Sequence, residues 1–300
     1  MDRAGSITDV AGVAVGHHTD AERGTGLTVI ILPEGSTGSV EVRGGAPGTR
    51  ETDLLRPENT VNRVDALLFA GGSAFGLDAA AGLMEGLREA DRGFRVGDTV
   101  VPIVPGAVIF DEGAMLGFAP GPAEARRAFE NADTGAFRTG RVGAGTGATV
   151  GKVLGHGYAS PGGLGTASVV VPGGLRVGAL AVVNALGDII GENGETLAGI
   201  GKGADVGSED LIMRSEGSVI PGASTTLVAV VTDARLTKAE ALRVAVMAGD
   251  GLARSIRPSH TPFDGDAVFV LSTGDGVADV LRIGTAAARA VERAIRNSVR

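Results

Sequence analysis

Short apolar runs, mostly bounded by glycine, recur along the chain and constrain its fold more than any other feature. Each has the length and the aliphatic, β-branched content of a buried strand. They span residues 26–32, 66–72, 167–174, 178–188, 226–234 and 267–274. Three other segments place apolar residues at helical spacing, at 76–90, 236–256 and 276–299. The second of these opens with Thr237 and Glu240 at capping-box spacing, which marks a helix start.

The predicted strands and helices neither alternate strictly nor separate into two blocks. This order favours a layered α/β sandwich over a doubly wound parallel sheet. From Thr225 onward we expect strand, helix, loop, strand and helix, and over 140–190 strands joined by glycine turns. Because no linker or break in composition divides the 300 residues, we expect a single domain over 1–300.

Composition excludes several classes of function. The chain has no cysteine and therefore no disulfide, thiolate metal site or cysteine nucleophile. A net charge of -8 and only 3% aromatic residues disfavour a nucleic-acid partner. The N-terminal residues lack the apolar core of a signal peptide, and the longest apolar region is interrupted by Pro172, Arg176 and Asn184. We therefore expect a soluble, cytoplasmic protein without a membrane partner.

Several motif-like stretches do not fit the patterns they resemble. The stretch 143–152 resembles a phosphate-binding loop, but Thr146 and Val153 stand where that pattern needs glycine and a hydroxyl residue. It is also a weak dinucleotide fingerprint, because Ala148 replaces the third glycine. The stretch GGSAFG has Phe75 where a nucleophile elbow needs glycine. The histidines lack metal-ligand spacing and are interpreted as structural: His17, His18, His156 and His260. No cofactor and no metal are predicted.

The stretch STTLVAVVTDA, which begins at Ser224, is where we expect chemistry. A threonine hydroxyl is a weak nucleophile, and the threonine's own α-amine can serve as its base when that threonine begins a chain. An internal threonine reaches this state if its hydroxyl attacks the preceding carbonyl and the resulting ester is hydrolysed. The small residues Gly222, Ala223 and Ser224 suit the strained turn that this step needs. The competing interpretation is plain strand propensity, since threonines are common at strand starts.

Four polar residues elsewhere are candidates for the same site. Asp264 and Asp266 share one face if they enter the strand that follows, and paired carboxylates raise one another's pKa and can hold an ammonium group. Lys152 and Asn184 lie in apolar surroundings, where burial without partners costs several kcal/mol. Asn184 is a candidate oxyanion donor and Lys152 an electrostatic anchor. The alternatives are an Asp-Gly-Asp turn and an asparagine that caps backbone groups.

Ordered segments along nearly the whole chain resemble one family, the self-processing aminopeptidases. This family includes L-aminopeptidase/D-esterase, the β-peptidyl aminopeptidases and nylon-oligomer hydrolase. The resemblance is carried by ITDVAGVAVGHHTD, GGAPGTRETDLLRP, GGSAFGLDAAAGL, VPIVPGAVIFD, RVGAGTGATVGK, VVNALGD, STTLVAVVTDA and TPFDGD. It implies a four-layer αββα sandwich like that of the N-terminal-nucleophile hydrolases, with its own connectivity. It also implies a homo-oligomer, expected as a tetramer.

The same resemblance implies cleavage between Ser224 and Thr225, which gives chains of residues 1–224 and 225–300. It assigns the nucleophile, its two acidic partners, the oxyanion donor and the neighbouring cation to Thr225, Asp266, Asp264, Asn184 and Lys152. A threonine with two aspartates looks closer to nylon-oligomer hydrolase than to members that use serine.

Two positions depart from the family pattern. Ser224 stands where relatives of nylon-oligomer hydrolase tend to have asparagine, which bears on the rate and position of cleavage. Phe110, a predicted substrate-binding residue, stands where some members have tyrosine, so any hydroxyl contribution is missing here.

We therefore predict an amide hydrolase that acts on peptides or small amides, with a free amine on the substrate that nearby acidic residues suit. The alternatives are an acyltransferase resembling ornithine acetyltransferase, which also self-cleaves before threonine, and a non-catalytic protein that never processes.

Overall fold

The structure is a computed structural model that describes residues 5–201, 206–214 and 224–300. Gly222 and Ala223, which the sequence analysis expects in the turn before the predicted cleavage site, lie outside these residues.

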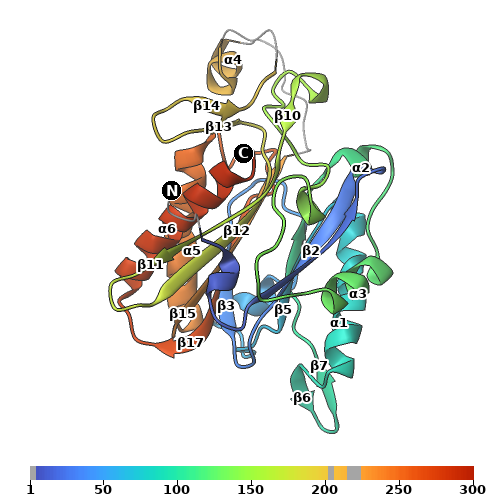
Figure 1. The fold of residues 1–300 in the computed structure, drawn as a ribbon, viewed down its shortest axis with the longest axis vertical. Coiled ribbons are helices and arrows are strands. Elements are labelled where there is room, and N and C mark those ends of the chain that lie inside the picture. Colours follow the sequence, from blue (N-terminus) through green and yellow to red (C-terminus); the bar gives the residue numbers. More distant parts are fainter. Residues whose placement is uncertain (1–4, 202–205, 215–223) are drawn as a thin grey trace.

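Two five-stranded sheets form the centre of the fold and share one apolar core (Figure 1). The first sheet has the order β1 (Ala14–Asp20), β2 (Thr25–Ile31), β5 (Ala66–Ala70), β8 (Gly106–Val108), β4 (Thr49–Arg50). The second has the order β11 (Gly163–Val170), β12 (Arg176–Asn184), β15 (Thr225–Ala234), β17 (Ala267–Gly276), β3 (Thr37–Val42). In these two sheets β5–β8 and β15–β17 pair in parallel and the other pairs are antiparallel.

Helices cover the outer face of each sheet. The helices α5 (Lys238–Ser255) and α6 (Val280–Asn297) pack on the second sheet, and α1 (Ala80–Glu89) and α3 (Pro122–Glu130) pack on the first (Figure 1). Each interface is a separate cluster of buried aliphatic side chains, as the hydrophobic effect requires of two-faced sheets. The expected four-layer αββα sandwich is confirmed.

Alternate residues of the strand β15 pack into two different apolar cores. Leu227, Ala229 and Val231 belong to the core between the sheets, whereas Val228 and Val230 belong to the core under the helices. Because side chains alternate along a strand, a strand buried on both faces is apolar throughout. The same alternation turns Thr225 toward the space between the two sheets.

The remaining elements are short. Three small sheets pair β9 (Thr149–Val150) with β10 (Ser160–Pro161), β6 (Phe94–Val96) with β7 (Thr99–Val101), and β13 (Asp188–Ile190) with β14 (Thr196–Ala198) and β16 (Ile256–Arg257). The short helices are α2 (Glu112–Met115) and α4 (Ser208–Arg214). Short 3-10 helices are η1 (Ile7–Asp9), η2 (Asp53–Leu55), η3 (Ser73–Ala79), η4 (Gly143–Gly145) and η5 (His156–Tyr158).

The predicted elements from Thr225 onward are confirmed, including the capping box of Thr237 and Glu240. Two elements predicted upstream of Thr225 have different bounds in the structure. The helix expected from residue 76 begins as the 3-10 turn η3 and becomes α-helical only at Ala80. The strand expected over 167–174 starts earlier and ends before Pro172, which cannot donate to the strand ladder. Within the described ranges, no helix is long and apolar enough to cross a bilayer.

Candidate active site

Thr225 is the first residue of β15, and only 6% of its surface is exposed. It lies directly opposite Asn184, the last residue of β12, in the antiparallel register. The predicted nucleophile therefore sits where the second sheet ends and the loops between the two sheets begin.

The carbonyl oxygen of Ser224 accepts two hydrogen bonds. The Oγ1 hydroxyl of Thr225 donates to it at 2.6 Å, and the backbone N–H of Gly265 donates at 2.9 Å. The hydroxyl thus lies against the carbonyl that it is predicted to attack. A backbone N–H on the same oxygen is the type of donor that stabilises negative charge developing there.

Asp264 and Asp266 lie in the loop before β17, so the condition under which they would share one face of that strand is not met. Both are buried, at 1% and 2% exposure. Asp266 accepts a hydrogen bond from the N–H of Thr226 at 2.7 Å through Oδ1 and from the N–H of His260 at 3.0 Å through Oδ2. It therefore fixes the backbone immediately after the predicted nucleophile.

Asp264 contacts the other side of the predicted scissile bond. Its backbone forms a parallel bridge with Ser224, and its Oδ2 accepts a hydrogen bond from the N–H of Thr261 at 2.8 Å. Burial and the neighbouring charge of Asp266 raise the pKa of Asp264 to about 6. The two carboxylates influence one another electrostatically, as their close spacing predicts.

Lys152 and Asn184 form the buried polar pair behind Thr225. The Nζ of Lys152 donates to the backbone oxygen of Asn184 at 2.7 Å and to its Oδ1 at 2.9 Å. Asn184 Oδ1 also accepts from the N–H of Thr149, and its Nδ2 donates to the carbonyl of Phe110 at 3.0 Å. Burial lowers the pKa of Lys152 to about 7, while the charges of Asp264 and Asp266 oppose that shift.

A cavity of about 180 Å³ opens beside Thr225. The first sheet and its loops supply one wall, and the loops around Thr225 supply the other. Its lining comprises Ala46, Pro47, Gly48, Ser73, Ala74, Val108, Phe110, Ser224, Thr225 and Phe263. The predicted substrate-binding residue Phe110 thus lines the same cavity as the predicted nucleophile.

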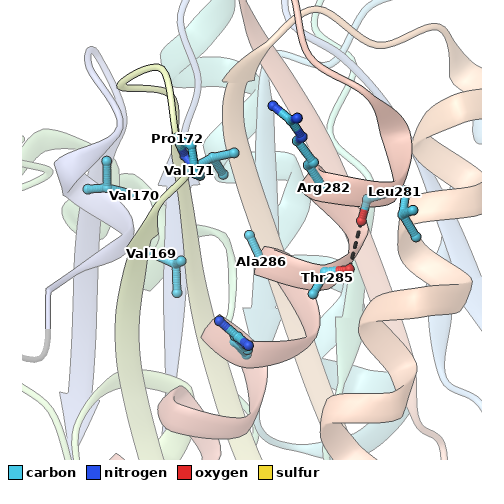
Figure 2. A pocket seen from close by; sticks show the side chains of 9 residues that line it. Val169, Val170, Val171, Pro172, Leu281, Arg282, Thr285 and Ala286 are labelled. Carbon is cyan, nitrogen blue, oxygen red and sulfur yellow. Dashed lines mark hydrogen bonds between the residues drawn. The ribbon is translucent and has the colours of Figure 1, made fainter.

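A larger groove, of about 370 Å³, lies between the end of β11 and α6 (Figure 2). Val169, Val171 and Ala286 line its apolar floor, and Arg282 stands at its edge. The residues predicted to carry chemistry do not line this groove, so the smaller cavity is the candidate active site.

The structure brings together all seven predicted site residues, and it adds two that the sequence analysis missed. His260 lies beside the site: its backbone N–H donates to Asp266 Oδ2, and its Nδ1 is 2.9 Å from the same oxygen without the geometry of a hydrogen bond. Gly265 contributes only its backbone N–H. A signal was available for both residues, because they lie within the HTPFDGD segment that carries the two aspartates. Among the residues that the structure describes, no cluster of three His, Asp or Glu side chains could hold a metal ion.

Comparison with known proteins assigns the chain to a family. The family model described as peptidase family S58 matches residues 5–300. The chain belongs to peptidase family S58. As an S58 member it is a hydrolase, which rules out the alternative of a non-catalytic protein.

Two S58 relatives cover most of the chain. An uncharacterized aminopeptidase of Mycobacterium tuberculosis is 43% identical over an alignment of 292 residues, with coverage of 90% of this chain and 81% of the relative. The 6-aminohexanoate-oligomer endohydrolase of Paenarthrobacter ureafaciens is 31% identical over 277 residues, 89% of this chain and 74% of the relative.

Solved structures agree with the S58 assignment at the level of fold. A β-aminopeptidase of Burkholderia sp. superposes with a TM-score of 0.75 at 24% identity, covering 99% of this chain and 86% of that one. The L-aminopeptidase D-Ala-esterase/amidase of Ochrobactrum anthropi also gives 0.75, at 22% identity and 99% and 87% coverage. The latter is described as a new variant of the Ntn hydrolase fold, which confirms the predicted fold class.

Proposed function

We propose that this S58 hydrolase matures by cutting its own Ser224–Thr225 bond and then hydrolyses peptides or small amides with Thr225 as nucleophile. One observation carries the proposal: the Ser224 carbonyl lies between the Thr225 hydroxyl and the N–H of Gly265. Attacking group, electrophile and charge-stabilising donor are thus in contact in the uncut chain, as an intramolecular reaction requires.

Maturation follows from this geometry in two steps. The Thr225 hydroxyl adds to the carbonyl carbon of Ser224, with the developing oxyanion held by Gly265 N–H. The C–N bond then breaks as the Thr225 nitrogen takes up the proton that the hydroxyl released, and the acyl group moves from nitrogen to oxygen. Water hydrolyses the ester, which leaves a carboxylate on Ser224 and a free amine on Thr225. One amide bond and one water are consumed.

In turnover the new amine takes the proton from Thr225 Oγ1, which attacks the substrate amide. The leaving amine departs, and water then hydrolyses the acyl ester and restores Thr225. We assign the stabilisation of the substrate oxyanion in this step to Asn184, which faces Thr225 across the strand pair. Asp264 and Asp266 bind the chain's own groups on both sides of Thr225, so we assign them to holding its new amine, and the ammonium that this amine becomes on taking the proton, rather than the ammonium of a substrate.

The substrate class is proposed from the relatives and from the cavity. One relative is named an uncharacterized aminopeptidase and another an endohydrolase of 6-aminohexanoate oligomers, and both names denote hydrolysis of amide bonds. The cavity beside Thr225, at about 180 Å³, is close to the ~150 Å³ apolar cavity that accommodates benzene. It suits the acyl part of a small amide.

The direct test is intact-mass analysis of the purified protein under denaturing conditions, with N-terminal sequencing of the products. We expect two chains, residues 1–224 and 225–300, the second beginning with Thr225. A fully active preparation made only of uncut chains contradicts the proposal. Hydrolysis assayed with and without an amino-acid acceptor separates this function from acyl transfer.

The backbone N–H of Gly265 can be tested by adding a single methyl group. In Gly265→Ala, a Cβ would stand 2.8 Å from Thr225 Oγ1 and 2.9 Å from the carbonyl oxygen of Ala46, so the loop or the hydroxyl must shift. Displacement of about 1 Å at a reacting centre can cost 10²-fold. We therefore expect self-cleavage to slow by about 10²-fold, measured as fragment formation over time.

Gly157→Ala is the matched control, because a Cβ there meets no atom within 4 Å and the glycine has no positive φ. It should mature at the wild-type rate. Equal maturation rates for both variants would show that the Gly265 contact has no part in the cleavage.

A cytoplasmic location and assembly into a homo-oligomer, expected as a tetramer, belong to the same proposal. They follow from the sequence and the family resemblance, and light scattering on the eluted protein tests the assembly.

A further inference from the structure

Ser73 lines the cavity that contains Thr225, and neither the sequence analysis nor the maturation chemistry uses it. It lies in the GGSAFG stretch that resembles a nucleophile elbow without matching one. It follows β5, whereas Phe110 follows β8. Because β5 and β8 are parallel, their carboxyl ends bring Ser73 and Phe110 to the same edge of the first sheet.

The backbone of Ser73 is held in an unfavourable conformation. Its φ is +56°, in the left-handed region that L-residues other than glycine rarely adopt. The preceding Gly72 also has a positive φ, at +82°. Glycine at position 73 would avoid the strain, yet the chain carries a hydroxyl there.

Buried contacts maintain this turn. Asp111, at 1% exposure, accepts hydrogen bonds from the N–H of Gly72 at 3.1 Å and from the hydroxyl of Thr25 at 2.7 Å. The N–H of Ser73 donates to the carbonyl of Ile109 at 2.9 Å. Strained residues that are fixed by their surroundings cluster at functional sites.

The hydroxyl of Ser73 is available to a ligand. It makes no hydrogen bond to any residue that the structure describes, and the residue is only half-buried. The other side chains of the cavity wall are apolar apart from Ser224 and Thr225. Backbone groups also contribute polar surface to this cavity, and among its side chains only Ser73, Ser224 and Thr225 offer a hydroxyl to a polar group on the acyl part of a bound amide.

We propose that Ser73 determines specificity by hydrogen-bonding an amine or amide N–H on the acyl part of the substrate, so that the site prefers aminoacyl and oligoamide substrates to plain acyl amides. This inference rests on the proposed function, because it concerns the same cavity. A site built to bond a polar substrate group discriminates against the analogue that lacks it.

The test pairs two variants with matched substrates. Ser73→Ala and Ser73→Gly both remove the hydroxyl, and the glycine variant also removes the backbone strain. Each is assayed on alanyl, β-alanyl and 6-aminohexanoyl p-nitroanilides and on their counterparts without the amine. We expect kcat/KM to fall by about 10-fold in both variants on the best amine-bearing substrate, and by less than about 2-fold on its counterpart.

Self-cleavage supplies a readout that a merely structural role would move. It uses the chain's own carbonyl, so both Ser73 variants should mature at the wild-type rate. The control is Phe75→Ala, on the same turn but 82% exposed and outside the cavity lining, which should leave every rate unchanged.

Three outcomes overturn the inference: no loss on any substrate, equal losses on both members of a pair, or a Ser73→Gly variant that keeps wild-type preference. A wild-type chain that stays uncut and hydrolyses none of the amides contradicts the proposed function itself, and is distinguishable from all three.

Discussion

Replacing Thr225 with alanine is expected to leave a single uncut chain of 29.9 kDa without measurable amidase activity. The substitution removes the hydroxyl that lies 2.6 Å from the Ser224 carbonyl oxygen and leaves the carbonyl and its Gly265 donor in place. Loss of a nucleophile costs hydrolases several orders of magnitude, so we expect both maturation and turnover to fall by at least about 10⁴-fold. Intact-mass analysis measures the first and p-nitroanilide release measures the second.

Two further variants locate the effect in one oxygen atom. Thr225→Ser keeps the hydroxyl and should still mature, at a rate within about tenfold of the wild type. Thr226→Ala removes the next hydroxyl along β15, whose Oγ1 is buried without a hydrogen-bond partner among the described residues. It should mature normally. If Thr225→Ala is cut, or if Thr226→Ala alone stays whole, Thr225 is not the nucleophile.

Local sequence patterns predict much of the fold. The alternation of Leu227, Val228 and Ala229 between two cores needs only a strand buried on both sides, and an apolar run bounded by turn residues predicts that. The Thr237 capping box likewise fixes the start of α5 from residues three apart. Such features were predictable because their physical cause lies within a few residues of the chain.

Long-range pairing was not predictable in the same way. The strand β3, over Thr37–Val42, completes the second sheet by pairing with β17, more than two hundred residues later. Its sequence includes Glu41 and glycine and was not identified as a strand. Nothing local specifies a partner so distant in sequence, because strand propensity depends on the neighbours that a strand finds.

The residues of the candidate site also fall into two groups, those that the sequence suggested and those that only the folded chain brings to the site. Thr225 and the two aspartates were candidates from their residue types and spacing, with strand propensity and an Asp-Gly-Asp turn as alternatives, and the family resemblance assigned their predicted roles. Gly265 lies in the conspicuous HTPFDGD segment, but its contribution could not be assigned from the sequence, since it is a backbone N–H whose direction only the folded loop defines. His260 and Ser73 were missed for a related reason. Both have positive φ values, of 57° and 56°, which a sequence of non-glycine residues does not indicate.

Under the proposed function, the uncut chain needs a base for the Thr225 hydroxyl that differs from the one in the mature enzyme. Before cleavage the nitrogen of Thr225 is part of a peptide bond, so it cannot act as the base for its own hydroxyl. Lys152 is the candidate for this first step. It is buried at 4% exposure and hydrogen-bonded to Asn184, which pairs with Thr225, and burial lowers its pKa to about 7. Near neutral pH a large fraction of this amine is therefore unprotonated.

Lys152→Met is accordingly expected to slow self-cleavage by about 10³-fold, within the range that a general base contributes. Wild-type maturation should accelerate as the pH rises through about 7, because deprotonation creates the basic form of Lys152, and it should slow in acid. The methionine variant should lose this dependence. Lys238→Met is the matched control: that lysine is 5% exposed and donates to the carbonyls of Leu54 and Asn59, outside the site. Thermal unfolding establishes that each variant is folded before its rate is compared. Wild-type maturation that is flat between about pH 5 and 9, or a folded Lys152→Met chain that cuts itself at the normal rate, assigns the first proton transfer to another group.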